Sequence, residues 1–216
     1  MPVAVDGRRR LAPEERKRLL LMYAVEVFSR RGIGRGGHTD IAEIGGVSVA
    51  TVFNYFKTRD ALVTDVLDEI AQFMHAMAED AFSAATTPLA RIRDYFQRFL
   101  RACEEQPDYI KVWLEWSASP REEVWPQYLS LQAELLERLT IQIEDAINLD
   151  ELDQGLSANE RARWVLGNSQ MLTGMMFDPM GKPDDMNALV NRAIDHLLLV
   201  KQPPSGERKS SRIDQN

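Results

Sequence analysis

The feature that most constrains the fold is a short stretch, residues 37–60, in which two brief helical patterns are joined by a pair of glycines. Thr39 or Asp40 is predicted to cap the first helix, because a short side-chain oxygen at that point can accept an unpaired backbone N–H. Gly45 and Gly46 are then expected to end it. Two helices joined by so tight a turn must pack directly against each other.

The second of these helices has two different faces. Ser48 is predicted to cap it. A spacing of i, i+3, i+4 and i+7 predicts that one face is buried, through Val49, Val52, Phe53 and Phe56. The opposite face is made of small, hydroxyl, amide and phenol groups, namely Ala50, Thr51, Asn54 and Tyr55. This face carries no carboxylate, so it can approach an anionic polymer.

This pattern is typical of a helix-turn-helix, whose second helix lies in the DNA major groove. Asn54 can bond to adenine N6 and N7, Thr51 can use its hydroxyl or methyl group, and Tyr55 can donate to a phosphate. An ordinary helical hairpin is the alternative, because glycine turns between helices are common. The predicted DNA-contacting residues of this region are Thr39, Ser48, Ala50, Thr51, Asn54, Tyr55 and Lys57.

The charge of the chain is unevenly distributed. The whole chain carries a formal charge of −7, which argues against a general nucleic-acid binder. Residues 1–60 contain 11 Lys and Arg against 7 Asp and Glu, a charge of +4, and the remainder contains 15 against 26, a charge of −11. A basic end on an acidic body predicts DNA contact at that end alone.

Residues 1–12 are predicted to form a basic arm ahead of the first helix. They include Arg8 and Arg10 and show no helical periodicity. An arginine arm can enter the minor groove of A·T-rich DNA, where the negative potential is strong. A disordered, solubilising terminus is the other interpretation of this segment.

The rest of the chain predicts an all-α fold, because helical periodicity continues without strand alternation. Pro126 is expected in the first turn of its helix or at a kink. We expect a helix-turn-helix domain over 13–57, a helical regulatory and dimerisation domain over 58–201, and a disordered tail over 202–216. The expected helices outside the central motif span 13–31, 58–82, 88–105, 108–118, 121–148, 158–177 and 185–200.

Two segments resemble a known family. GVSVATVFNYFKTRDAL at 46–62 is similar to the motif of the tetracycline-repressor (TetR) family of transcriptional regulators. RRGIGRGGHTDIAEIGGVSVATVFNYF at 30–56 and KVWLEWSASPREEVW at 111–125 resemble, more narrowly, the quorum-sensing master regulators of the HapR/SmcR type. The resemblance implies a DNA-binding regulator whose arm carries two alternate arginines, and Arg8 and Arg10 match those positions.

Aromatic and sulfur side chains at helical spacing follow in the second domain. Most of them are expected to form a packed core, yet helices that enclose a space with a few polar groups are typical small-molecule sites. The resemblance implies an apolar cavity behind Trp113. Relatives have a phenylalanine and a cysteine where this chain has Val165 and Ser169, so its ligand preference is expected to differ. The predicted pocket residues are Phe73, Met77, Phe96, Leu100, Trp113, Trp116, Val165 and Ser169.

The resemblance also implies a homodimer formed by the two C-terminal helices. A monomer that uses these residues for its own core is the alternative. A two-fold dimer separates its recognition helices by about 34 Å and requires a near-palindromic operator. The small and apolar positions considered for this interface are Val165, Leu172, Gly174, Met175, Leu189, Ile194, Leu197 and Leu198.

Several classes of protein are disfavoured by composition. No apolar run reaches the roughly 20 residues of a membrane span, and no signal peptide begins the sequence, so a cytoplasmic protein is expected. Cys103 and three scattered histidines lack metal-ligand spacing, and neither a cofactor motif nor a catalytic motif is present. We therefore predict no metal, no cofactor and no enzyme. The rival function is a helical small-molecule-binding protein that has lost the use of its DNA face.

Overall fold

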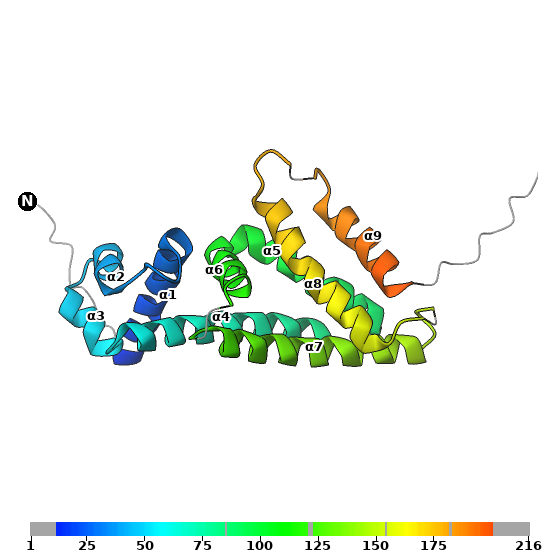
Figure 1. The fold of residues 1–216 in the computed structure, drawn as a ribbon, viewed down its shortest axis with the longest axis horizontal. Helices are drawn as coiled ribbons and strands as arrows, with labels where there is room; N and C mark the ends of the chain where they lie inside the picture. Colours follow the sequence, from blue (N-terminus) through cyan, green and yellow to red (C-terminus); the bar gives the residue numbers. More distant parts are fainter. Residues whose placement is uncertain (1–11, 85, 121–122, 154, 182, 201–216) are drawn as a thin grey trace, which may run out of the picture.

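The computed structural model describes residues 12–84, 86–120, 123–153, 155–181 and 183–200, and this part of the chain consists of helices joined by loops (Figure 1). A single antiparallel bridge, Leu152 to Val200, accompanies the helices. The all-α prediction is therefore confirmed. The helices are α1 (Pro13–Arg31), α2 (His38–Gly45), α3 (Val49–Tyr55), α4 (Arg59–Phe82), α5 (Pro88–Glu105), α6 (Pro107–Ser117), α7 (Trp125–Asn148), α8 (Ala158–Phe177) and α9 (Met186–Leu198).

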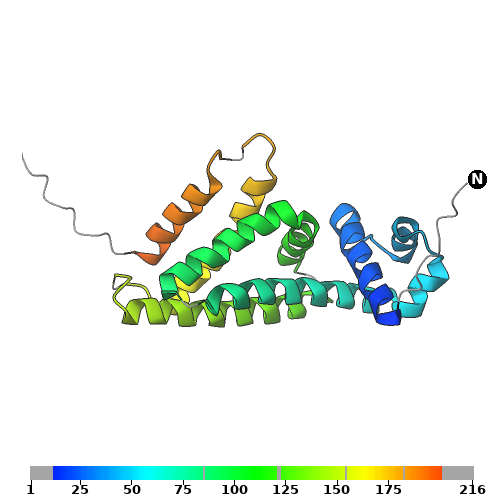
Figure 2. The same cartoon turned by 180° about the vertical axis from the view of Figure 1, so that it is seen from behind.

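The first three helices gather at one end of an elongated molecule, and α4 leads from them into the remainder (Figure 1). α1 buries Leu20, Ala24 and Phe28, and α4 continues the same core through Leu62 and Val66. α4 is 24 residues long and packs against both α5 and α7 (Figure 2). One continuous helix therefore supports the N-terminal helices and the larger helical bundle.

Local sequence signals account for most helix boundaries. The Thr58 hydroxyl accepts the Ala61 N–H at 3.1 Å at the start of α4. Ser157 and Glu160 form a reciprocal capping box at the start of α8, and these hydrogen bonds lower the pKa of Glu160. Pro126 lies in the first turn of α7, as predicted, where its missing N–H leaves no hydrogen bond broken.

Two buried tryptophans organise the bundle around α6. Trp116 is fully buried and donates its indole N–H to the Val124 carbonyl at 2.9 Å, which ties α6 to the residue just ahead of α7. Trp113 meets Phe99 of α5 edge to face, with ring centroids 5.5 Å apart. α6 is therefore fixed to α5 on one side and to the beginning of α7 on the other.

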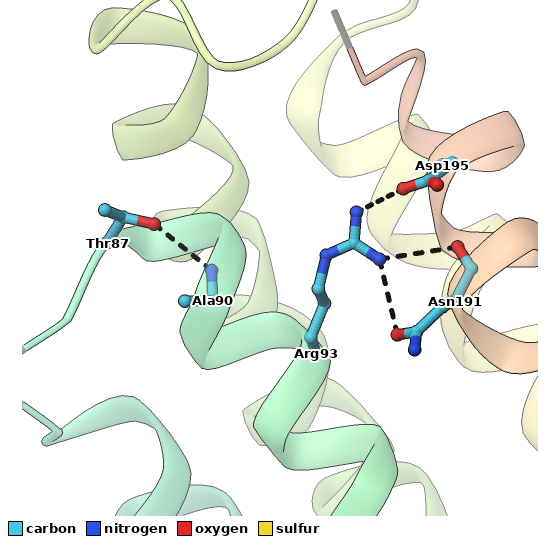
Figure 3. A network of polar contacts seen from close by, with 5 residues as sticks. All are labelled: Thr87, Ala90, Arg93, Asn191 and Asp195. Carbon is cyan, nitrogen blue, oxygen red and sulfur yellow. Dashed lines mark hydrogen bonds and ion pairs between the residues drawn. The ribbon is translucent and has the colours of Figure 1, made fainter. Parts of the chain in front are cut away.

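The last helix is attached to the bundle by polar contacts as well as by packing (Figure 3). Arg93 of α5 donates to the carbonyl and side-chain oxygens of Asn191, at 3.4 and 3.3 Å, and pairs with Asp195. Arg161 of α8 is buried and donates to three backbone carbonyls, including that of Leu198 at the end of α9. These two arginines set the position of α9 against α5 and α8.

The exposed side of α8 differs from the prediction. Val165 and Leu172 of α8, and Ile194 and Leu198 of α9, are buried within their own chain, so they cannot form a surface for a partner. The helices turn other residues outward, because the burial of these four in the bundle orients each helix. The exposed residues of α8 include Trp164, Gly167, Met171 and Gly174.

Some predictions fall outside the described residues. These are the basic arm with Arg8 and Arg10 and the C-terminal segment 202–216. Among the described helices, none combines the length and apolar character that crossing a membrane requires.

The attachment of α9 can be tested with Arg93→Ala. The substitution removes charge-assisted hydrogen bonds to Asn191 and Asp195 and is expected to lower the free energy of unfolding by about 1–2 kcal/mol. Arg30→Ala is the control, because Arg30 makes an exposed i,i+4 pair with Glu26 that is worth about 0.3–0.5 kcal/mol. Denaturant unfolding measures both, and equal losses would contradict this role of Arg93.

Candidate nucleic-acid interface and its link to the regulatory helices

The two short helices form the predicted helix-turn-helix, but the first begins two or three residues earlier than expected. Gly37 is its N-cap, and the Gly37 N–H donates to the carboxylate of Asp40 at 3.1 Å. The prediction that Thr39 or Asp40 caps this helix is therefore wrong. Asp40 instead reaches back from the first turn, as the third helical residue of a capping box does. Gly46 adopts a left-handed conformation, with φ of 58°, and ends the helix as predicted.

Ser48 caps the second short helix, as the sequence predicted. Its hydroxyl accepts the Thr51 N–H at 3.1 Å, and the hydroxyls of Ser48 and Thr51 lie 2.8 Å apart. The N–H groups in the first turn of a helix have no carbonyl partner within that helix. The Ser48 cap satisfies one of them, which matters more in α3 because this helix has only seven residues. The side chains of Ser48 and Thr51 thus start the recognition helix and hold each other in place.

The buried face of α3 is narrower than predicted. Val52 and Phe56 are buried, at 0% and 1% exposure, but Val49 and Phe53 are 37% and 45% exposed. The prediction that all four face the core is wrong for Val49 and Phe53. A two-turn helix over a small core buries only one row of side chains, here Val52 and Phe56. Phe53 lies beside this row and stacks on the His38 ring instead of entering the core. The outward surface of α3 is therefore Val49, Ala50, Phe53 and Asn54, with Thr51 and Tyr55 half-buried at its edge.

His38 is the residue that sequence reasoning missed. Its ring stacks on Phe53 with centroids 3.9 Å apart and planes 7° apart, and its Nε2 lies 2.7 Å from the Phe56 carbonyl oxygen. His38 is buried. It therefore holds both the flank and the end of α3. The sequence offered no signal for this role, because a histidine after a glycine-rich loop has no periodic partner.

Some cationic side chains near this surface are free to bind a phosphate, and one is bonded to its own chain. Lys57, at the end of the recognition helix, and Arg35, in the loop before α2, are exposed. Arg59 donates to the Ile33 carbonyl at 2.6 Å, so part of its guanidinium is committed to its own chain. Thr39 is exposed in the first turn of α2. Lys57 and Thr39 are thus both accessible in the helix-turn-helix, and side chains of these types bind the phosphates that flank a helix in the major groove.

α6 of the larger bundle binds directly to the loop that precedes α2. The Glu115 carboxylate accepts the Ile33 N–H through both oxygens, at 3.0 and 3.1 Å. Ser29 of α1 donates to Asp108 of α6 at 2.6 Å. Gly32 has φ of 86°, and a Cβ there would lie 3.1 Å from Glu115 Oε1. α6 is therefore a second link between the bundle and the DNA-binding helices, in addition to the continuous α4.

A cavity inside the bundle lies next to the same helix. It is small, about 30 Å³, and it is bordered by Met74, Tyr95, Trp113, Tyr128, Leu131, Gln132, Leu135, Leu166 and Ser169. Of the predicted pocket residues, Trp113 and Ser169 border it. Four others are buried near it without lining it, namely Phe96, Leu100, Trp116 and Val165.

Phe73 and Met77 lie elsewhere, in a surface hollow of about 330 Å³ between α4 and α5. Arg98, Arg101, Asp80 and Glu105 also line this hollow. The eight residues predicted for one pocket are thus distributed among the cavity, the packed core and this hollow. The reason is that Phe73 packs on Tyr109 of α6 and, with Met77, lines the hollow beside α5, so neither side chain borders the cavity next to Trp113.

The cavity is mostly apolar with a few polar groups. Burial raises the pKa of Tyr128, against hydrogen bonds with Gln170 and Ser117 that lower it. Burial also raises the pKa of Tyr95. Both phenols are therefore uncharged at neutral pH and can donate a hydrogen bond. Within the described part of the chain, no three His, Cys, Asp or Glu side chains gather as a metal site.

The region that contains the helix-turn-helix matches a known family. Residues 20–66 match the model of bacterial regulatory proteins of the tetR family, and this segment includes the whole of α2 and α3. The DNA-binding segment of the chain is therefore of the TetR family type. The resemblance stated from the sequence is thereby confirmed.

A curated member of the TetR family is similar over a longer segment. The HTH-type transcriptional regulator LuxR of Vibrio harveyi is 44% identical over 128 residues. The match covers 59% of this chain and 62% of LuxR, so the chain spans about three fifths of that relative's length. The likeness to LuxR therefore extends beyond the DNA-binding helices into the larger bundle.

Solved structures show that the whole TetR fold is present. A regulator from Saccharomonospora viridis in complex with choline has a TM-score of 0.72 at 17% identity, covering 88% of this chain and 100% of that one. FadR of Bacillus subtilis in complex with stearoyl-CoA has a TM-score of 0.66 at 20% identity, covering 84% and 97%. At such low identity these neighbours establish the fold and not the ligand.

Glu115→Ala tests the link between α6 and the DNA-binding helices. The substitution leaves the buried Ile33 N–H without its acceptor and is expected to cost about 1–3 kcal/mol of stability. It should also speed hydrogen exchange of the Ile33 amide, measured by NMR. Glu137→Ala, at an exposed position of α7, is the control and should change neither. Unaltered exchange at Ile33 in Glu115→Ala would show that the link does not restrain the loop.

Proposed function

We propose that the protein is a dimeric, sequence-specific DNA-binding transcriptional regulator of the quorum-sensing master-regulator type. The observation that carries the proposal is the exposed face of α3. This face exposes Asn54 and Ala50 and carries no carboxylate. α3 lies at one end of the molecule (Figure 1) and within the segment that matches the TetR family. Similarity to LuxR and to the quorum-sensing motifs supports the narrower assignment.

The contacts follow from the chemistry of each side chain. Asn54 bonds to adenine through both amide groups, and Thr51 contacts a neighbouring base through its hydroxyl or methyl. Tyr55, Lys57, Thr39 and Ser48 bind phosphates and set the register of α3 on the duplex. Arg8 and Arg10, which lie outside the described residues, enter the adjacent minor groove.

A homodimer through the C-terminal helices brings two copies of α3 to one near-palindromic operator. An exposed stripe on α8 supports this: Trp164 and Met171 are 62% and 50% exposed, and Gly167 and Gly174 lie on the same side of the helix. A Cβ added at either glycine would meet nothing within 4 Å in the monomer, so the backbone is open to a second helix. Large exposed apolar side chains beside small ones favour a helix-to-helix interface.

Regulation is proposed to act through the cavity or through the amount of protein. A cavity of about 30 Å³ holds no more than a small group, so an apolar ligand enters only by moving its walls. Trp113 is one wall, and it lies two residues before Glu115, which holds the Ile33 loop. A ligand that shifts α6 therefore changes the placement of the DNA-binding helices. If it binds one arrangement of these helices more tightly than the other, it raises the population of that arrangement.

The rival is a helical small-molecule-binding protein that has lost the use of its DNA face. The exposed Asn54, the intact Ser48 cap and the positive charge of residues 1–60 weigh against it. The match to a family of bacterial regulatory proteins also favours a regulator over an enzyme, as the sequence predicted. A regulator of transcription acts on the chromosome, so we place the protein in the cytoplasm.

Asn54→Ala tests direct reading of DNA. A duplex is first selected from random sequences by the wild-type protein. Loss of a bidentate amide contact to adenine is expected to weaken binding to that duplex by about 1–3 kcal/mol, with the salt dependence unchanged because no phosphate contact is lost. Fluorescence anisotropy at several salt concentrations measures both. The exposed Asn148 supplies the control variant Asn148→Ala, and equal affinity of Asn54→Ala and wild type would argue for the rival function.

Met171→Glu tests the dimer face. A carboxylate on an apolar helix interface is left unpaired and desolvated, so the variant is expected to sediment as a monomer and to lose affinity for a two-half-site duplex. Met180→Glu changes a methionine that is 96% exposed in the loop before α9 and serves as the control. Analytical ultracentrifugation separates the species. A dimeric Met171→Glu protein would place the interface elsewhere.

A further inference from the structure

Phe53 is an exposed aromatic residue on a helix that the proposed function places in the major groove. It is 45% exposed, although its neighbours Val52 and Phe56 are buried. Val49, one turn earlier on the same flank, is 37% exposed. Together with Ala50, these side chains form an apolar patch directly beside Asn54. In the free protein this apolar patch is exposed to solvent. An exposed apolar patch on a binding helix favours contact with an apolar group of the partner.

The Phe53 ring is held rigidly. One face lies parallel to the His38 imidazole at 3.9 Å, and His38 is itself buried and hydrogen-bonded to the Phe56 carbonyl. Phe53 nevertheless remains 45% exposed, so part of the residue is open to a partner. A ring fixed in this way loses little conformational entropy when it makes a further contact, so it is preorganised for binding.

The major groove offers one apolar group to such a ring. The edges of A, G and C present only hydrogen-bond donors and acceptors, whereas thymine presents the C5 methyl group. Asn54 projects from the next position of α3 and matches adenine, the partner base of thymine. The apolar patch and the amide therefore suit an A·T-containing step of the half-site.

We infer that Phe53, supported by His38, reads the C5 methyl of a thymine in each half-site and so determines part of the sequence specificity. This inference rests on the proposed DNA-binding function. Val49 borders the contact, and His38 acts as a positioning residue that does not touch DNA.

The test uses the full chain and the duplex selected by wild-type protein. Each thymine is replaced in turn by deoxyuridine, which lacks only the C5 methyl group. At one thymine in each half-site we expect affinity to fall about fourfold, the size expected for burial of a single methyl. The same replacement should have no effect on Phe53→Ala, because the contact is already gone.

Two further variants sharpen the assignment. Val49→Ala should retain the penalty at that thymine, and its loss there would assign the methyl to Val49 instead of Phe53. Met22→Ala removes another exposed apolar side chain of the same domain, 53% exposed on α1, and should retain the full pattern. If Phe53→Ala loses its helical circular dichroism, Phe53→Leu is used in its place. Replacement of the thymine by deoxyuridine should then weaken binding by less than in wild type, because leucine cannot lie flat on His38.

The inference is overturned if no thymine replacement weakens wild-type binding. It is also overturned if the penalty is unchanged in Phe53→Ala. Both results leave the proposed function standing as long as Asn54→Ala still weakens binding. Failure of the wild-type protein to select any sequence is a different result and removes the proposed function itself.

Discussion

The structure depends on the packing of one very short helix. α3 has seven residues, and a helix of that length does not persist alone in water. It exists because Val52 and Phe56 are buried against α2 and the core, because Ser48 caps its start, and because His38 donates to the Phe56 carbonyl at its end. These contacts hold α3 in place and leave one flank and its outer face exposed. Any binding by the exposed surface of α3 depends on them.

The DNA-binding helices are joined to the bundle in two places, through α4 and through α6. α4 is continuous between them, but a single helix can rotate about its own axis relative to its neighbours. Glu115 and Asp108 of α6 add hydrogen bonds to the Ile33 loop and to Ser29 of α1. Arg59 of α4 binds the carbonyl of Ile33, so one residue is held from both helices. Because Trp113 of α6 also lines the cavity, the bundle interior and the DNA-binding end share a common element.

Charge and shape agree with this division. The first 60 residues carry a net positive charge, and the remaining acidic body repels phosphate. The cavity is small and has aromatic walls, and the polar side chains that line it include two neutral phenols, a hydroxyl and one amide. Such a site suits an apolar molecule with a hydrogen-bonding group, and it requires the walls to move before anything can enter.

Sequence alone determined the helices and their main chemistry. Periodicity predicted the all-α fold, glycine and serine located the turn at Gly46 and the cap at Ser48, and motifs at 46–62 and 111–125 indicated the family. These signals are local, because caps and periods act within a few residues.

Only the tertiary structure decided which sides of the helices face outward. The exposure of Phe53 depends on a ring supplied by α2, and the Glu115 bond joins residues 82 positions apart. Trp164 and Met171 replaced Val165 and Leu172 as the outer face of α8, since packing against α7 and α9 sets the rotation of that helix. Periodicity specifies that a helix has an apolar side, but the exact rotation and the long-range partners come from packing of the whole chain.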